Sequence, residues 1–230
     1  MKPNRPLISA LALTLALGLA GPARADMVLS QVIVDLLPAK PPRDDIEVWN
    51  DGDERLYVSA EPFEIRAAGT PAETRSPAGT PEESGLLVAP QRLILEPGER
   101  RTIRIALIGE RPPSDRVFRV AIKPVAGPVS ASTDALKVFV GYDTLVLVRP
   151  EGPTSEIEGQ RAGRTLTLRN TGNTAQELFD GRQCDASGAD CRALPAKRLY
   201  PGATWEQALP FDAEVTYRSS IGPEVRERRF

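Results

Sequence analysis

Two cysteines, Cys184 and Cys191, are the residues of this chain whose spacing most directly suggests chemistry. Six residues lie between them, so the pair does not form the C-x-x-C motif of a thioredoxin-like redox centre. Two thiolates are also too few for a cysteine-only zinc site. In an oxidising compartment such a pair forms a disulfide. We therefore predict a structural cross-link between Cys184 and Cys191, without a redox function.

The absence of histidine removes most catalytic alternatives. Ser-His-Asp triads, histidine general bases and histidine-ligated zinc all require that residue. The sequence also contains no phosphate-binding glycine loop and no nucleophile elbow. An enzyme that uses only Asp, Glu, Lys, Tyr or Ser has no positive support. We expect a protein without catalytic residues, metal or cofactor.

A long β-prone segment at residues 136–148 is the other feature with functional meaning. Leu136, Val138 and Val140 alternate with Lys137 and Phe139, so the three apolar side chains share one face of an extended strand. About thirteen residues without a turn signal exceed the usual strand length of roughly 3–10 residues. Such a strand either packs on the protein's own core or offers an edge to another chain.

The N-terminus has the form of a secretion signal. Lys2 and Arg5 precede an apolar run at residues 7–19, and Ala23 and Ala25 form an A-x-A cleavage pattern. The run is shorter than the roughly 20 residues of a membrane span. We expect residues 1–25 to be removed and the protein to be exported without membrane insertion. An uncleaved anchor is the alternative.

Length and charge narrow the remaining classes. Removal of residues 1–25 leaves 205 of the 230 residues, enough for two domains of the immunoglobulin size. The signal also removes three of the 29 basic residues, leaving 26 against 31 acidic residues and a net charge of −5. Phosphate recognition needs a basic surface, so nucleic acid is not an expected partner.

Short apolar runs between 22 prolines and 18 glycines indicate an all-β chain. We predict an N-terminal domain at residues 26–149, a stiff linker at 150–153 and a smaller β domain within 150–230. Residues 67–84, rich in Pro, Gly, Thr and Glu, are expected to form a loose loop, and the end of the chain a charged tail. Strands are expected at residues 28–35, 45–49, 55–61, 86–88, 91–95, 101–107, 116–122, 136–148, 165–169, 176–179, 197–200, 204–209 and 214–217.

Several motifs, in order, resemble those of the periplasmic pilus-assembly chaperones, the PapD-like family. The longest is the phrase VAPQRLILEPG at residues 88–98, which Asp115-Arg116 and Arg149-Pro150 follow at the family's positions. In the second half, LRNTGNT at residues 168–174 and LYPG at 199–202 fit the same family. The likeness covers nearly all of the chain after the signal.

The resemblance implies two immunoglobulin-like β-sandwich domains in tandem, set at an angle. It further implies a periplasmic chaperone that binds pilus or fimbrial subunits and delivers them to an outer-membrane usher. In such chaperones the last strand of the first domain is lent to an incomplete pilin, a form of β-augmentation known as donor-strand complementation. The implied donor residues are Leu136, Val138 and Val140. A self-capping dimer through the same edge is also plausible.

The chain departs from the family at the residues that bind the subunit's C-terminal carboxylate. The family's arginine and lysine fall here at Gln31 and Leu145, neither of which is basic. Lys137, Lys123 or Arg43 could substitute, with Lys137 our candidate. Otherwise the protein is a divergent chaperone for other subunits, or it has kept the fold and lost the activity.

Arg149 is the expected interdomain residue, and a glutamate that usually pairs with it is replaced by Val117. An exposed charge at a domain end is the alternative for Arg149. Another class of function also stays open, a structural or adhesive component of the surface fibre. A self-assembling pilin would need a disordered donor extension at its N-terminus, whereas here residue 26 leads directly into an expected strand.

Overall fold

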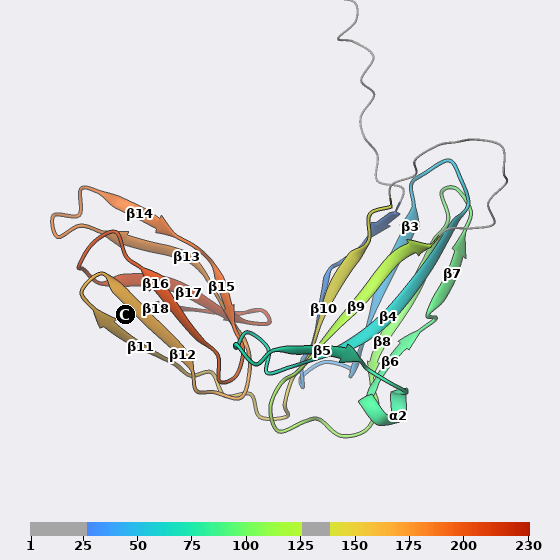
Figure 1. The fold of residues 1–230 in the computed structure, drawn as a ribbon, viewed down its shortest axis with the longest axis horizontal. Helices are drawn as coiled ribbons and strands as arrows, with labels where there is room; N and C mark the ends of the chain where they lie inside the picture. Colours follow the sequence, from blue (N-terminus) through green and yellow to red (C-terminus); the bar gives the residue numbers. More distant parts are fainter. Residues whose placement is uncertain (1–26, 126–138) are drawn as a thin grey trace, which may run out of the picture.

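The protein, described by a computed structural model for residues 27–125 and 139–230, is almost entirely β. Four sheets form two lobes that diverge from a narrow junction (Figure 1). The predicted fold class, two β-sandwich domains in tandem set at an angle, is confirmed. We propose residues 149–150 as the domain boundary, because the last strand of the first lobe ends at Val148 and the next begins at Ile157.

The first domain is a sandwich of two sheets. One sheet has the order β1-β3-β8-β6, and the other has the order β2-β10-β9-β4-β5, with β7 also pairing with β4. The strands of the first sheet are β1 (Met27–Leu29), β3 (Arg43–Asn50), β8 (Arg100–Leu107) and β6 (Leu86–Ala89). Those of the second are β2 (Ile33–Leu36), β10 (Tyr142–Val148), β9 (Arg116–Val125), β4 (Leu56–Arg66), β5 (Thr74–Pro77) and β7 (Arg92–Leu95).

Alternation along the strands builds the core of this domain. In β8, Ile103 and Ile105 are fully buried while Arg104 between them is exposed, as the period of two predicts. In β10, Val146 and Val148 join the same apolar cluster from the opposite sheet. Each sheet therefore contributes one apolar face, and the other face of β8 is solvated.

The strand expected at residues 28–35 is in fact two strands in different sheets. β1 pairs antiparallel with β3, whereas β2 pairs parallel with β10. The extended strand is interrupted at Ser30 and Gln31, where the Ser30 hydroxyl accepts a hydrogen bond from Glu47 N (2.9 Å). The crossing places β2 at the edge of the second sheet, beside the last strand of the domain.

The expectation of a loose loop at residues 67–84 is wrong. It contains β5, which pairs with the end of β4, and a single-turn helix, α2 (Pro81–Ser84). The helix begins with a capping box formed by Thr80 and Glu83 and ends at Gly85, whose φ of 67° is left-handed. Turn-rich composition concealed these elements because their hydrogen bonds, rather than an apolar pattern, define them.

The second domain has a sheet of order β11-β12-β16 and a sheet of order β14-β13-β17-β18, with β15 also pairing with β13. The expected charged tail is wrong, since residues 224–229 form β18, paired along its length with β17. Its side chains are mostly exposed, so no apolar alternation marked it. The strands are β11 (Ile157–Ala162), β12 (Thr165–Asn170), β13 (Gln176–Cys184), β14 (Cys191–Leu194), β15 (Lys197–Leu199), β16 (Thr204–Ala208), β17 (Val215–Ile221) and β18 (Glu224–Arg229).

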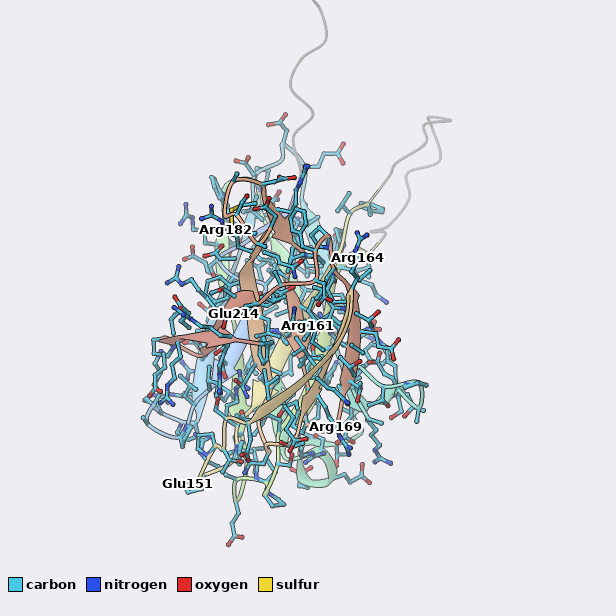
Figure 2. All side chains as sticks on the ribbon, turned by 90° about the vertical axis from the view of Figure 1, so that its left-hand side faces the viewer. Glu151, Arg161, Arg164, Arg169, Arg182 and Glu214 are labelled. Atoms are coloured by element: carbon cyan, nitrogen blue, oxygen red, sulfur yellow. A yellow bond between two sulfur atoms is a disulfide. The ribbon has the colours of Figure 1, made fainter. Side chains whose placement is uncertain are left out.

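The surface of this domain is strongly charged. Figure 2 shows Arg161, Arg182 and Glu214 among the side chains that project from it. Arg161 pairs with Asp212 at 3.1 Å. Within the described residues, no helix is long and apolar enough to cross a membrane.

Both domains contain the same buried asparagine corner. Asn50 donates to Leu95 O (3.1 Å) and Glu54 O (2.8 Å), and its own carbonyl accepts from Gly98 N (2.9 Å). Asn170 repeats the arrangement with Leu199 O (2.9 Å), Thr174 O (2.8 Å) and Gly202 N (2.9 Å). Both asparagines are fully buried. The corner joins the Asn-x-Gly turn to the Pro-Gly turn in each domain, which is why both motifs recur in the sequence.

Candidate functional site

The last strand of the first domain has an open edge along its first three residues. β10 pairs with β9 from Tyr142 to Val148, but on its other side β2 pairs only with Leu145 to Val148. Within the described residues, no strand covers this side of residues 142–144. A further strand could pair with the backbone there, in exchange for the hydrogen bond that Arg119 Nη1 donates to Asp143 O (3.1 Å).

The strand is shorter than the thirteen residues expected from the sequence. It begins at Tyr142, and Phe139 and Val140 precede it without strand structure. Leu136, Lys137 and Val138 lie outside the described residues. Val140 is 64% exposed, so it contributes nothing to the core of its own domain.

The chain before β10 nevertheless stays close to β9. A Cβ added to Gly141 would lie 2.9 Å from Lys123 Cβ and 3.3 Å from Ile122 O. A larger residue would therefore force the two segments apart. The Tyr142 hydroxyl donates to Met27 O (3.0 Å), which fixes the start of β10 to the start of β1.

The two faces of β10 point into different apolar clusters. Tyr142, Val146 and Val148 face the sandwich core. Leu145 and Leu147 face outward and form a second cluster with Val117 and Ala68. This second cluster lies at the domain junction, because Tyr200 of the second domain packs against it.

The tip of the β4–β5 hairpin reaches the second domain. Ala68 is buried there, and a Cβ on Gly69 would lie 3.0 Å from Tyr200 Cδ2. Figure 1 shows β5 extending across the space between the lobes. Leu145, at the position of the family's lysine, is consequently 4% exposed beneath an apolar cover.

The other positions considered for binding a carboxylate are also unsuitable. The amide of Gln31 donates to Asp45 O (3.1 Å), and Lys123 pairs with Glu61 (3.1 Å). Arg43 is exposed at the start of β3. None of the three lies in the apolar cluster around Leu145.

Arg119 is a cation near the domain junction that the sequence analysis did not identify. It is the cross-strand partner of Leu145, so the two side chains lie on the same face of the sheet. Its Nη1 donates to Asp143 O (3.1 Å), and its side chain remains 34% exposed. The signal was the antiparallel register of residues 116–122 against 142–148, which the sequence analysis did not use.

Arg149 lies at the centre of the domain junction, with 1% of its side chain exposed. It binds Asp35 through Nε (2.6 Å) and Nη2 (2.9 Å). Its Nη1 donates to Asp115 (2.9 Å) and, in the second domain, to Thr174 Oγ1 (2.9 Å) and Ala175 O (2.7 Å). The alternative of an exposed charge is therefore wrong. Asp35 provides a second carboxylate for Arg149, and Val117 instead joins the apolar cluster.

Asp115 completes this junction. It accepts hydrogen bonds from Ala175 N (2.6 Å) and Thr174 Oγ1 (2.9 Å) as well as from Arg149. Burial raises the pKa of Asp115, although the charge of Arg149 and these hydrogen bonds oppose the rise. The carboxylate thus joins residues of both domains in one network.

A second arginine fixes the connection between the domains. Arg111, only 10% exposed in its side chain, donates to Leu36 O (2.7 Å), Arg149 O (3.0 Å) and Leu37 O (2.8 Å). These carbonyls belong to the end of β2 and to the residue where the linker begins. Arg111 lies between β8 and β9, and nothing in the local sequence pattern shows which distant carbonyls it binds.

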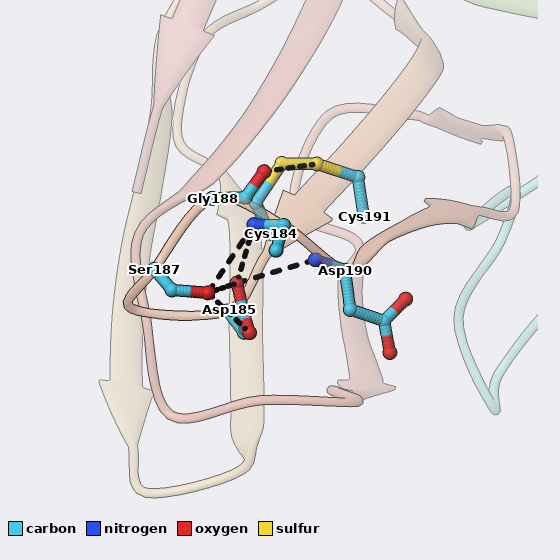
Figure 3. The surroundings of a disulfide bond; sticks show 7 residues. Cys184, Asp185, Ser187, Gly188, Asp190 and Cys191 are labelled. Atoms are coloured by element: carbon cyan, nitrogen blue, oxygen red, sulfur yellow. Dashed lines mark hydrogen bonds between the residues drawn. A yellow bond between two sulfur atoms is a disulfide. The ribbon is translucent and has the colours of Figure 1, made fainter.

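The predicted disulfide is present between Cys184 and Cys191, which face each other across the β13–β14 hairpin. Asp185 closes the turn beside it, accepting from Ser187 Oγ (2.9 Å) and Ala189 N (3.0 Å) (Figure 3). The Ser187 hydroxyl, assisted by backbone N–H groups, lowers the pKa of Asp185. The disulfide therefore stabilises the β13–β14 hairpin, which lies far from the domain junction.

No family model matches the chain, and no curated protein matches it by sequence. Solved structures do. The class 5 fimbriae chaperone CfaA is 21% identical, with a TM-score of 0.67 over 88% of this chain and 98% of that one. The E. coli chaperone DraB is also 21% identical, with a TM-score of 0.60 over 89% and 96% of the two chains.

A third similar structure is that of the Salmonella enterica SafA pilin in complex with the SafB chaperone. It is 16% identical, with a TM-score of 0.63 over 91% of this chain and 98% of that one. The whole two-domain fold is therefore shared with periplasmic chaperones of fimbriae, at the low identity of a divergent sequence.

Proposed function

We propose that this protein is a periplasmic chaperone that binds pilus or fimbrial subunits by lending them, as an added strand, the segment that precedes β10. The observation that carries the proposal is the open edge at residues 142–144, which begins two residues after the exposed Val140. The subunit, an immunoglobulin-like domain that lacks one strand, would be delivered to an outer-membrane usher. The chaperone would need no cofactor, because folding of the subunit supplies the free energy.

The alternation of side chains along residues 136–142 supports this proposal. Val140 lies two residues before Tyr142, whose side chain packs on the core of the sandwich. In an extended strand, Leu136, Val138 and Val140 would continue that face. The apolar row of β10 would thus run from this protein's core into the groove of the subunit.

Burial of the three apolar side chains would provide enough free energy to bind a subunit. Full burial of one aliphatic side chain contributes about 1.5–3 kcal/mol, so three contribute roughly 5–9 kcal/mol before ordering costs. Main-chain hydrogen bonds would fix the register of the added strand. The structural neighbours, which include a complex of a pilin with its chaperone, have this same two-domain fold.

We infer that Arg119 holds the subunit's terminal carboxylate, in place of the cations missing at Gln31 and Leu145. Arg119 is the partly exposed cation beside Leu145, and its partner Asp143 already forms a bidentate pair with Arg75 (2.8 and 2.9 Å). Arg119 can therefore turn to a new carboxylate while Arg75 keeps Asp143 neutralised. Lys137, the residue favoured from the sequence, remains a second candidate for this role.

The proposal is tested by replacing Val140 with Glu, alone and together with Val138→Glu. Co-expression with a fimbrial subunit encoded beside this chain should yield a one-to-one periplasmic complex with the unmodified protein. The variants should fold normally but lose that complex. Val225→Glu is the matched control, because Val225 is a 44% exposed valine on the second domain and should retain the complex.

Two results would contradict the proposal. A complex that survives both Glu substitutions would show that the strand is not the binding element. Polymers of this chain alone would favour a structural component of the fibre.

A further inference from the structure

Exposed apolar side chains gather at one end of the second sheet of the first domain. Eight large apolar side chains are well exposed among the described residues, and four of them, Ile94, Val125, Phe139 and Val140, lie at this end. Single exposed apolar residues need no explanation, whereas several in one place mark an interaction site. Val140 is already assigned to the groove of the subunit, but the other three have no role in the proposed function.

Strand pairing places Ile94 and Val125 in one row across β7, β4 and β9. Both are cross-strand partners of Tyr57, one on each side of it. Directly opposite residues of antiparallel strands share a face, with Cβ atoms about 4.5–5.5 Å apart. The preceding residues, Leu93 and Pro124, are buried, so the row lies on the outer face of the sheet. Ile94 is 51% exposed there and Val125 39%.

Phe139 extends this row towards β10. The register of β9 against β10 still holds at Gly141, where an added Cβ would lie 2.9 Å from Lys123 Cβ. The same register carried two residues further places Phe139 opposite Val125. Because Phe139 alternates with Val140, its side chain belongs to the outer face, where it is 38% exposed. We call the row of Ile94, Tyr57, Val125 and Phe139 the apolar ridge.

A groove of about 520 Å³ adjoins the apolar ridge. It is lined by residues 57–61 of β4, by residues 91–94 at β7 and by Val125. The cation and the carboxylate of the next rows, Lys123 and Glu61, pair with each other (3.1 Å). Apolar side chains that enter such hollows often dominate the affinity of an interface. The ridge and its groove therefore suit an apolar loop of a partner better than a charged one.

The apolar ridge is continuous with the proposed subunit-binding segment. β9 ends at Val125, and the donor residues Leu136 and Val138 lie further along the β9–β10 connection. A subunit that takes up the donor segment as an inner strand pairs with both of its edges. On one edge the subunit's strand continues along residues 142–144. On the other edge its strand must stop where β9 begins to pair, so the loop that ends this strand lies at Val125.

We propose that the apolar ridge is a second contact surface for the captured subunit, which packs an apolar loop on it. This inference rests on the proposed function. The donor side chains fill the groove of the subunit from one face of the sheet, and the ridge binds the loop on the opposite face. The subunits that this protein accepts therefore carry a large apolar side chain in the loop next to β9.

The test measures how long a purified one-to-one complex with the neighbouring fimbrial subunit survives when an excess of differently tagged, unmodified chaperone is added. Ile94→Gln and Val125→Gln should each release the subunit about five- to tenfold faster, because each loses part of the burial of one aliphatic side chain. Both side chains are exposed in the free protein, so folding should be unchanged, which denaturant unfolding checks.

Ile108→Gln is the matched control. Ile108 is 42% exposed at the other end of the domain, where its N–H donates to Gly85 O beside α2 (2.7 Å). This variant should release the subunit at the unmodified rate. A photoreactive p-benzoylphenylalanine in place of Ile94 should cross-link to the subunit, and the same group in place of Ile108 should not.

The outcomes separate this inference from the proposed function. If both ridge variants keep the unmodified rate while Val140→Glu still loses the complex, the ridge is not a contact and only this inference fails. If the unmodified protein forms no complex, both fail. If the ridge variants change only the sedimentation of the free protein, the ridge is an interface between copies of this chain, which also overturns the inference.

Discussion

Arg149 Nη1 and Asp115 Oδ2 lie 2.9 Å apart at the domain junction, with 1% and 0% of their side chains exposed. Both residues belong to the first domain, and both form hydrogen bonds with Thr174 and Ala175 of the second. The ion pair is therefore part of the connection between the domains. A buried pair of this kind is costly to break, because the remaining charge cannot be solvated. The junction therefore depends on both partners.

Replacing Arg149 with Met should destabilise the protein by about 3–5 kcal/mol, the usual cost of leaving a buried carboxylate unpaired. Denaturant unfolding measures this loss. Arg104→Met is the control, because Arg104 forms an exposed pair with Asp45 (2.8 Å) on the solvated face of β8 and should show no measurable loss. Equal losses of unfolding free energy in the two variants would mean that the buried pair contributes no more than an exposed one.

Tyr217, in the core of the second domain, should make the stability of that domain depend on pH. Burial raises the pKa of its phenol to about 12, above the ordinary value of about 10. The unfolded chain therefore loses this proton first, and stability should fall as the pH rises from about 10 to about 12. Tyr217→Phe should remove that part of the alkaline slope, measured as unfolding free energy against pH. An identical slope in the variant would disprove the assignment.

Arg119→Gln should weaken capture of a subunit with a free C-terminus by roughly tenfold to a hundredfold, the value of a charge-assisted hydrogen bond of about 1.5–3 kcal/mol. A subunit with an amidated C-terminus should bind both proteins equally. Arg100→Gln is the matched control, since Arg100 lies on the other sheet and pairs with Glu47 (2.9 Å). A weakening that persists with the amidated subunit would assign Arg119 to folding instead.

Removing the disulfide with Cys184→Ala and Cys191→Ala should cost about 2–3 kcal/mol by the chain-entropy estimate for so short a loop. Unfolding should report the loss, while affinity for a subunit should stay unchanged because the hairpin is remote from β10. Loss of subunit binding in the folded variant would instead connect the hairpin to function.

Export should leave a mature protein that begins at Asp26. Mass spectrometry of the periplasmic fraction measures this directly. A product that retains residues 1–25 in the membrane would support the uncleaved anchor.

Much of the first domain could be predicted because its strands alternate clearly, as Ile103, Arg104 and Ile105 show. The charged strand β18 could not, because its exposed side chains carry no apolar period. The partners of Arg149 were equally hidden, since Asp35 lies 114 residues away in the sequence. The shared asparagine corner was visible as two Asn-x-Gly turns and two Pro-Gly turns, but only the hydrogen bonds relate them.

The candidate site, too, could be predicted only in part from the sequence. Alternation pointed to residues 136–140, and the structure adds that the edge of β10 is open over residues 142–144. Arg119 depends on cross-strand register, which one sequence does not specify without the pairing of β9 and β10.

The hairpin tip that rests on Tyr200, together with the carbonyls held by Arg111, has a thermodynamic consequence for capture. The angle between the domains is already fixed before a subunit arrives. If the protein binds subunits as proposed, binding would not require the two domains to be reoriented. In that case the protein would act as a preorganised template, and the entropy cost of association would fall mainly on the subunit.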